Sequence, residues 1–194
     1  MKAIILAAGI ASRLRPLTDT MPKCLLQIGQ RCLLQRAFDG LIANGISEFV
    51  VVTGYRHEQI EDFLGAHYPD QNIHFIYNEV FASTNNIYSL WLTRSETEGQ
   101  DILLLDSDIL FDPRIVSRVL ASEKPDVLAL NNHSLSEEEI KVIVDEKGNV
   151  KEISKVCSIE HSKGESIGIE KMSSAYTAAL FKELEQMIEK EGLD

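Results

Sequence analysis

The sequence has few cysteines, few aromatic residues and a deficit of positive charge. Its 194 residues include three cysteines and 7% aromatic residues, and 19 lysines and arginines stand against 30 aspartates and glutamates, a net charge of -11 at pH 7. Cys24, Cys32 and Cys157 are odd in number and fit no metal-site spacing, which predicts reduced thiols in a cytoplasmic protein. The acidic balance argues against nucleic acid as a partner, because phosphate backbones are bound by clustered lysine and arginine.

Long hydrophobic runs are missing as well. No stretch approaches the roughly 18 consecutive apolar residues of a membrane-spanning helix, and the first residues do not have the pattern of a signal peptide. We therefore expect no membrane partner. The length and a hydrophobic content of 44% suit one α/β domain with a sizeable core.

Against this acidic background, residues 3–26 gather positive charge. A short apolar run ends in two alanines and Gly9, and a polar loop with Arg13, Arg15 and Lys23 follows. The branched apolar residues predict a strand buried on both faces. Open α/β sheets bind ligands just beyond the ends of such strands, which makes this loop a candidate binding site. A solvated basic loop is the alternative interpretation.

The same stretch resembles the signature of the nucleotidyltransferases that make NDP-sugars and CDP-alcohols, L-A-A-G-x-x-x-R-L-x-P-L-T-x-x-x-P-K-x-L. The residues that fall on it are Leu6, Ala7, Ala8, Gly9, Arg13, Leu14, Pro16, Leu17, Thr18, Pro22, Lys23 and Leu25. The spacing is neither that of a P-loop nor that of a dinucleotide fingerprint. The resemblance implies an α/β fold of the nucleotide-diphospho-sugar transferase type, a Rossmann-like, mostly parallel sheet flanked by helices. It also implies a single nucleotidyltransferase domain over residues 1–194, shortened at its C-terminal end relative to the family.

The rest of the chain alternates between expected strands and helices. Strands are predicted over residues 2–7, 48–53, 72–77, 101–105, 126–130 and 167–170. Helices are predicted over residues 30–43, 57–64 and 113–122, after Asn85 or Asn86, and after Ser173 or Ser174. Residues 140–144 and 150–153 predict a small inserted β-hairpin that turns at Gly148. Repeated strand–helix alternation predicts parallel strands with right-handed crossovers.

Nucleotidyl transfer brings two anionic substrates together, so it needs positioning and charge neutralisation more than a covalent intermediate. The backbone amides after Gly9 suit a phosphate group. The resemblance implies that Arg13 grips the triphosphate and the leaving pyrophosphate, and that Lys23 neutralises charge where the substrates meet. It further assigns the nucleotide-binding wall to Leu6, Ala7, Ala8 and Gly9.

Asp108 is the candidate metal ligand. It follows the apolar run Leu103–Leu105 in the sequence Leu-Leu-Leu-Asp-Ser-Asp, and Mg²⁺ prefers one or two carboxylates together with phosphate oxygens. The resemblance assigns the metal to Asp108 and leaves Asp106 a supporting or structural role. Members of the family supply a second carboxylate from a segment beyond the helix that ends this chain. A turn at the end of a strand is the alternative for both aspartates.

The choice of nucleotide depends on Asn85 and Asn86. The stretch Asn-Asn-Ile-Tyr-Ser-Leu resembles the CTP:phosphocholine and 2-aminoethylphosphonate cytidylyltransferases more than the sugar-phosphate enzymes. Asparagine amides donate and accept hydrogen bonds, so they suit a cytosine edge or a ribose. Capping of the following helix is the alternative for each of the two, and one can cap while the other binds.

The acceptor side is assigned to Lys155, Glu165 and Gly168. Lys155 falls where the family places a phosphate-binding lysine, Glu165 is a partner for an amine, and Gly168 allows a substrate to approach closely. Residues 131–144 contain no aromatic side chain for a quaternary ammonium cage and carry three glutamates, which favours a primary amine over choline. A solvated acidic loop would have the same composition and is the alternative interpretation of these residues.

Together these features predict a Mg²⁺-dependent cytidylyltransferase of the cytoplasm. It would transfer CMP from CTP to a phosphorylated amino-alcohol or aminophosphonate and release pyrophosphate, with small molecules as its partners. A sugar-1-phosphate nucleotidyltransferase that uses UTP or dTTP is one rival, and a catalytically inactive nucleotide-binding domain is the other. The sequence leaves the acceptor and the oligomeric state open.

Overall fold

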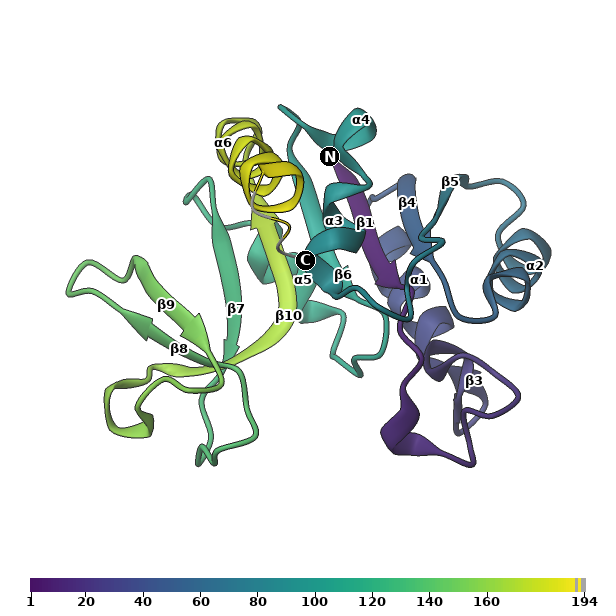
Figure 1. Ribbon diagram of the computed structural model, residues 1–194, viewed down its shortest axis with the longest axis horizontal. Helices are drawn as coiled ribbons and strands as arrows, with labels where there is room; N and C mark the ends of the chain where they lie inside the picture. Colours follow the sequence, from purple (N-terminus) through teal and green to yellow (C-terminus); the bar gives the residue numbers. More distant parts are fainter. Residues whose placement is uncertain (191, 193–194) are drawn as a thin grey trace.

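The computed structural model describes residues 1–190 and residue 192. An eight-stranded sheet runs through it in the order β5-β4-β1-β6-β10-β8-β9, and β7 also pairs with β10 (Figure 1). Its strands are β1 (Lys2–Ala7), β4 (Glu48–Thr53), β5 (Asn72–Tyr77), β6 (Ile102–Asp106), β7 (Val127–Asn131), β8 (Lys141–Val144), β9 (Val150–Ser154) and β10 (Gly164–Met172).

The neighbours β5, β4, β1 and β6 are parallel, as the strand–helix alternation predicts. Both faces of this part of the sheet are covered, and therefore β1 is apolar and buried from Ala3 to Ala7. The helices are α1 (Leu33–Ala43), α2 (His57–His67), α3 (Asn86–Trp91), α4 (Arg94–Thr97), α5 (Arg114–Leu120) and α6 (Ser174–Glu185), which continues as a π-helical turn over Gln186–Lys190.

Two hydrophobic clusters show which helices cover which face. One joins Ile5 of β1 to Phe38 of α1, together with side chains of α2 and α5. The other joins Ile4 to Leu90 of α3 and Phe181 of α6. The expected Rossmann-like sheet flanked by helices is thus confirmed.

Beyond β6 the sheet changes direction. Strand β10 is antiparallel to β6 and to β7, and β8 and β9 form the expected hairpin, with Gly148 at φ 81° in its turn. Figure 1 shows the hairpin at the side of the molecule away from β5. The strand expected over residues 167–170 is longer than predicted, because its pairing with β7 continues across a register shift between Ser166 and Glu170.

Two helix boundaries were wrong by three residues. Helix α2, expected to end at Leu64, continues to His67. The helix expected from Gln30 begins at Leu33, because Gly29, at φ 70°, turns the chain between the short strands β2 (Gln27–Ile28) and β3 (Arg31–Cys32). Ser173 caps α6, as one of the two expected serines. Within the described residues, no helix combines the length and the apolar composition needed to cross a membrane.

Candidate active site

The carboxyl ends of β1 and β6 are neighbours in the sheet, and a cavity of about 600 Å³ opens there. The chain that leaves β1 forms the signature loop, residues 9–22, which extends below β1 in Figure 1. Eight of the predicted site residues line the cavity: Leu6, Ala7, Gly9, Arg13, Lys23, Asn86, Asp108 and Lys155. The fold thus brings together residues from four separate stretches of the sequence.

Lys23 and Asp108 form an ion pair on the cavity wall. Lys23 begins the 3-10 turn Lys23–Leu25, and its Nζ donates to Asp108 Oδ2 at 2.5 Å. Both side chains keep about a third of their surface exposed, 34% and 38%. The ammonium group is therefore held at the cavity and stays accessible to an anionic substrate. Arg13 lies in the 3-10 turn Ser12–Leu14 and is exposed at the same cavity.

Asp106 is more closely involved in the site than the sequence indicated. Asn86 Nδ2 donates to its Oδ1 at 3.2 Å, and both residues line the cavity. Burial raises the pKa of Asp106 to about 6; the nearby charge of Asp108 adds to this rise and Lys23 opposes it. The acidic pair Asp-Ser-Asp was visible in the sequence, but the contact with Asn86 depends on the fold.

Gly168 makes room for Asp106. Its φ is 70°, and a Cβ atom at this position would lie 2.5 Å from Asp106 Oδ2. Gly168 was expected to admit a substrate; instead, the group that approaches it closely is the Asp106 carboxylate, and Gly168 is not among the cavity-lining residues.

The two neighbouring asparagines have different positions. Asn85 caps α3, because its Oδ1 accepts from the backbone N–H of Ile87 at 2.8 Å. Asn86 lies on the cavity, whereas Asn85 and Ala8 are not among its lining residues. Capping therefore accounts for Asn85, and Asn86 is the candidate that reaches a nucleotide.

On the acceptor side, Lys155 and Ile140 reach the cavity, and Glu165 does not line it. Glu165 Oε2 lies 2.8 Å from His133 Nε2. This contact, together with a hydrogen bond to the Ser134 carbonyl, raises the pKa of His133. A role of Glu165 in amine binding stays a prediction, and the histidine partner was not foreseen from the sequence.

Asp106 and Asp108 are the carboxylates that the cavity offers to a cation. In the described part of the chain, no group of three or more histidine, cysteine, aspartate or glutamate side chains is placed to hold a metal ion. Mg²⁺ often takes one or two carboxylates and completes its shell with substrate phosphates and water. The donor set therefore fits a cation shared with a bound triphosphate.

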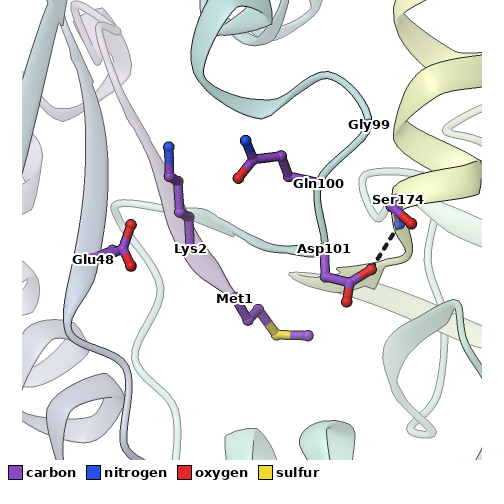
Figure 2. Close-up of a pocket in the computed structure, with 7 residues that line it drawn as sticks. All are labelled: Met1, Lys2, Glu48, Gly99, Gln100, Asp101 and Ser174. Carbon is purple, nitrogen blue, oxygen red and sulfur yellow. Dashed lines mark hydrogen bonds between the residues drawn. The ribbon is translucent and has the colours of Figure 1, made fainter.

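A second, shallower pocket lies at the opposite, amino-terminal end of the strands, between Lys2, Glu48 and Gln100. Figure 2 shows Asp101 at its edge, where the Asp101 carboxylate accepts from the backbone N–H of Ser174 at 2.8 Å. This carboxylate occupies the N-terminus of α6. The pocket contains none of the predicted site residues.

The profile of the MobA-like NTP transferase domain family matches residues 3–194. The chain belongs to this family. The match covers almost the whole sequence and confirms the resemblance that the stretch around Gly9 indicated.

Two curated proteins and one solved structure illustrate the likeness. The choline-phosphate cytidylyltransferase of Streptococcus pneumoniae is 37% identical over 107 residues, which is 55% of this chain and 45% of that protein. The CMP-5'-(3-aminopropyl)phosphonate synthase of Streptomyces rubellomurinus is 33% identical over 129 residues, 66% of this chain and 20% of that protein. This chain therefore spans less than half the length of these two curated relatives.

The solved structure is that of the CTP:phosphocholine cytidylyltransferase from Streptococcus pneumoniae. It superimposes with a TM-score of 0.77 at 25% identity, over 99% of this chain and 78% of that one. This agreement extends the family likeness from the signature to the arrangement of the whole sheet.

Proposed function

We propose that this chain transfers a cytidylyl group from CTP to a phosphorylated amino-alcohol or an aminophosphonate and releases pyrophosphate. The observation that carries the proposal is the single cavity that joins Arg13, Lys23 and Lys155 to the carboxylate of Asp108. In a protein of net charge -11, three cations at one cavity indicate a strongly anionic ligand. The names of the cytidylyltransferase relatives support CTP as the nucleotide.

The reaction needs two anions to be held against their repulsion. An oxygen of the acceptor phosphate or phosphonate attacks the α-phosphorus of CTP, a new P–O bond forms, and the bond to the pyrophosphate oxygen breaks. Lys23 neutralises charge near the point of attack, and Arg13 binds the triphosphate and then the pyrophosphate. Fixed charges of this kind stabilise the transition state most when they are already in position before the reaction.

Asp108, with Asp106 beside it, would hold Mg²⁺ together with the triphosphate. When bound, the ion would supply additional positive charge to the phosphate oxygens. The chain's own contribution is to keep the Asp108 carboxylate next to the Lys23 ammonium, so that cation and lysine sites share one wall of the cavity.

We assign the acceptor's phosphate or phosphonate group to Lys155; this assignment is supported by the position of Lys155 on the cavity wall, together with Ile140. Among the described residues, no aromatic side chain lines this cavity. A quaternary ammonium is usually recognised by aromatic faces. This composition supports a primary amine, such as that of 2-aminoethylphosphonate, over choline.

The test is pyrophosphate release with CTP, UTP, GTP and dTTP, each paired with 2-aminoethylphosphonate, phosphoethanolamine, phosphocholine and hexose 1-phosphates. We expect turnover with CTP and an amine-bearing acceptor. Asp108→Asn, purified in the same way, controls for contaminating activity. Turnover confined to hexose 1-phosphates with UTP or dTTP would favour a sugar nucleotidyltransferase, and no turnover with any pair would favour an inactive nucleotide-binding domain.

A further inference from the structure

The signature loop is held in place by side chains that follow β4. The Tyr55 hydroxyl lies 2.9 Å from the carbonyl oxygen of Thr18 and 3.1 Å from that of Asp19. Arg56 Nη2 donates to the Asp19 carbonyl at 2.7 Å, and Gln59 Nε2 donates to the Thr20 carbonyl at 3.0 Å. Three consecutive carbonyl groups of the loop are thus bonded by one short segment of the chain.

Tyr55 and Arg56 act as a connected pair. Arg56 Nε donates to the Tyr55 hydroxyl at 3.0 Å, and the guanidinium lies 5.4 Å from the centre of the Tyr55 ring. The hydroxyl therefore accepts from Arg56 while it donates to the loop. Hydrogen bonds linked in this way polarise one another and hold their members in a fixed geometry.

Apolar burial contributes little to the position of residues 12–20 of this loop, whereas Pro22 at its end is buried. Of residues 12–20, Thr18 alone is buried, and Leu17 is 63% exposed. The buried Thr18 hydroxyl is used within the loop, where it donates to the Ala11 carbonyl at 3.0 Å. A segment with so few buried apolar contacts opens easily unless polar contacts hold it, so the bonds from residues 55–59 determine where it lies.

The backbone that carries Tyr55 and Arg56 is also constrained. Arg56 has a φ of 52°, a left-handed conformation that is unfavourable for a residue with a Cβ atom. Tyr55 N donates to the carbonyl of Ala8 at 3.0 Å, and a Cβ at Gly54 would lie 2.6 Å from that same oxygen. The segment is therefore fixed against the end of β1 on one side and against the signature loop on the other.

We infer that Tyr55, Arg56 and Gln59 are positioning residues that hold the signature loop, and through it Arg13 and Lys23, in the geometry that receives the nucleoside triphosphate. The inference rests on the proposed function. Arg56 is a cation close to the site, yet it is not among the residues that line the cavity. Its guanidinium serves the loop backbone and not the ligand.

The test variant is Tyr55→Phe combined with Arg56→Met, which removes the donors of these two side chains, leaves that of Gln59 and keeps side chains of similar size. We expect kcat/KM for CTP to fall at least tenfold, while KM for the acceptor changes less than threefold. In the protein without substrates, amide hydrogen exchange should become faster within residues 11–21 and stay unchanged in β1 and β6. Arg94→Met is the matched control, because it removes a guanidinium of α4 that is bonded to Glu98, just after that helix, and to Glu185 of α6.

Unchanged exchange in residues 11–21 together with unchanged kcat/KM would overturn the inference. A uniform increase of exchange over the whole chain would also overturn it, since that pattern reports lost global stability and not release of the loop. The exchange measurement needs no turnover. If the wild-type protein uses no nucleotide, the proposed function fails, while hydrogen exchange still tests whether Tyr55 and Arg56 hold the loop.

Discussion

The ammonium of Lys23 lies 2.5 Å from the carboxylate of Asp108, across 85 residues of sequence. Both side chains remain partly exposed at the cavity. An exposed ion pair adds only about 0 to 1 kcal/mol to the free energy of unfolding. The pair therefore has little value as a stabilising contact, and its position between the signature loop and β6 suits charge control at a reaction centre.

Removing either partner should damage activity far more than stability. We expect Lys23→Ala and Asp108→Ala each to lower kcat/KM by at least two orders of magnitude, about 3 kcal/mol or more of transition-state stabilisation. The free energy of unfolding should change by about 1 kcal/mol or less. Steady-state kinetics and urea denaturation measure the two quantities. A near-normal rate in either variant would remove that residue from the mechanism.

Alanine variants of the neighbouring Asn85 and Asn86 should affect different properties, stability in the first case and CTP binding in the second. Asn85→Ala loses the cap of α3 and should lower the free energy of unfolding by about 1 kcal/mol, with little change in KM for CTP. Asn86→Ala loses the amide that contacts Asp106 on the cavity wall, and we expect a higher KM for CTP with little change in stability. The reverse pattern would show that the nucleotide contacts Asn85.

Two glycines with similar backbone conformations offer another matched pair. Gly168 has φ 70° and Gly148 has φ 81°, but a Cβ atom would collide with Asp106 at Gly168 and meet nothing within 4 Å at Gly148. Gly148→Ala should cost about 1 to 2 kcal/mol of stability from backbone strain alone. Gly168→Ala should cost more, and it should also reduce kcat/KM because Asp106 must move. Equal kinetics in the two variants would argue against a role of Asp106 in the site.

Glu170 should make the protein less stable at higher pH. Burial, with the charge of Asp106 adding to it, raises the pKa of Glu170 to about 7 from a usual value near 4.5. A carboxyl group whose pKa is raised by folding contributes its full stability below the unfolded-state pKa and loses it as the pH rises through the folded-state pKa. We expect the ionisation of Glu170 to lower the free energy of unfolding by on the order of 1 to 3 kcal/mol between pH 4 and pH 8.

The test for Glu170 is thermal unfolding of Glu170→Gln across that pH range. The glutamine cannot ionise, so the variant should gain in Tm over the wild type at pH 8 and gain little or nothing at pH 5. A difference in Tm that does not depend on pH would show that Glu170 titrates normally in the folded protein.

Local patterns predicted most of the fold. The buried run of β1, the alternation of strands and helices up to β6, and the hairpin that turns at Gly148 all follow from short stretches of sequence. The start of α1 was misplaced because helical spacing over residues 33–42 was extended backward to Gln30, directly after Gly29, whose positive φ makes a turn. A glycine followed by polar residues was the signal that was missed.

Contacts across long stretches of sequence could not be predicted. The signature implied a site role for Arg13 and Lys23, and the wider family resemblance implied one for Asp108; all three residues line the cavity. The packing of Asp106 against Gly168 depends on the pairing of β6 with β10, and the support of the loop by Tyr55 depends on the path of the chain after β4. Neither relationship leaves a periodic pattern in the sequence.

The measurement that tests cytidylyl transfer most directly is phosphorus NMR of the products formed from CTP and 2-aminoethylphosphonate. We predict that free pyrophosphate appears together with one pair of mutually coupled signals, a phosphonate and a phosphate joined through oxygen. The same spectrum with Lys23→Ala should show unreacted CTP. Coupled product signals with UTP and a hexose 1-phosphate, and none with CTP and any amine-bearing acceptor, would contradict the account.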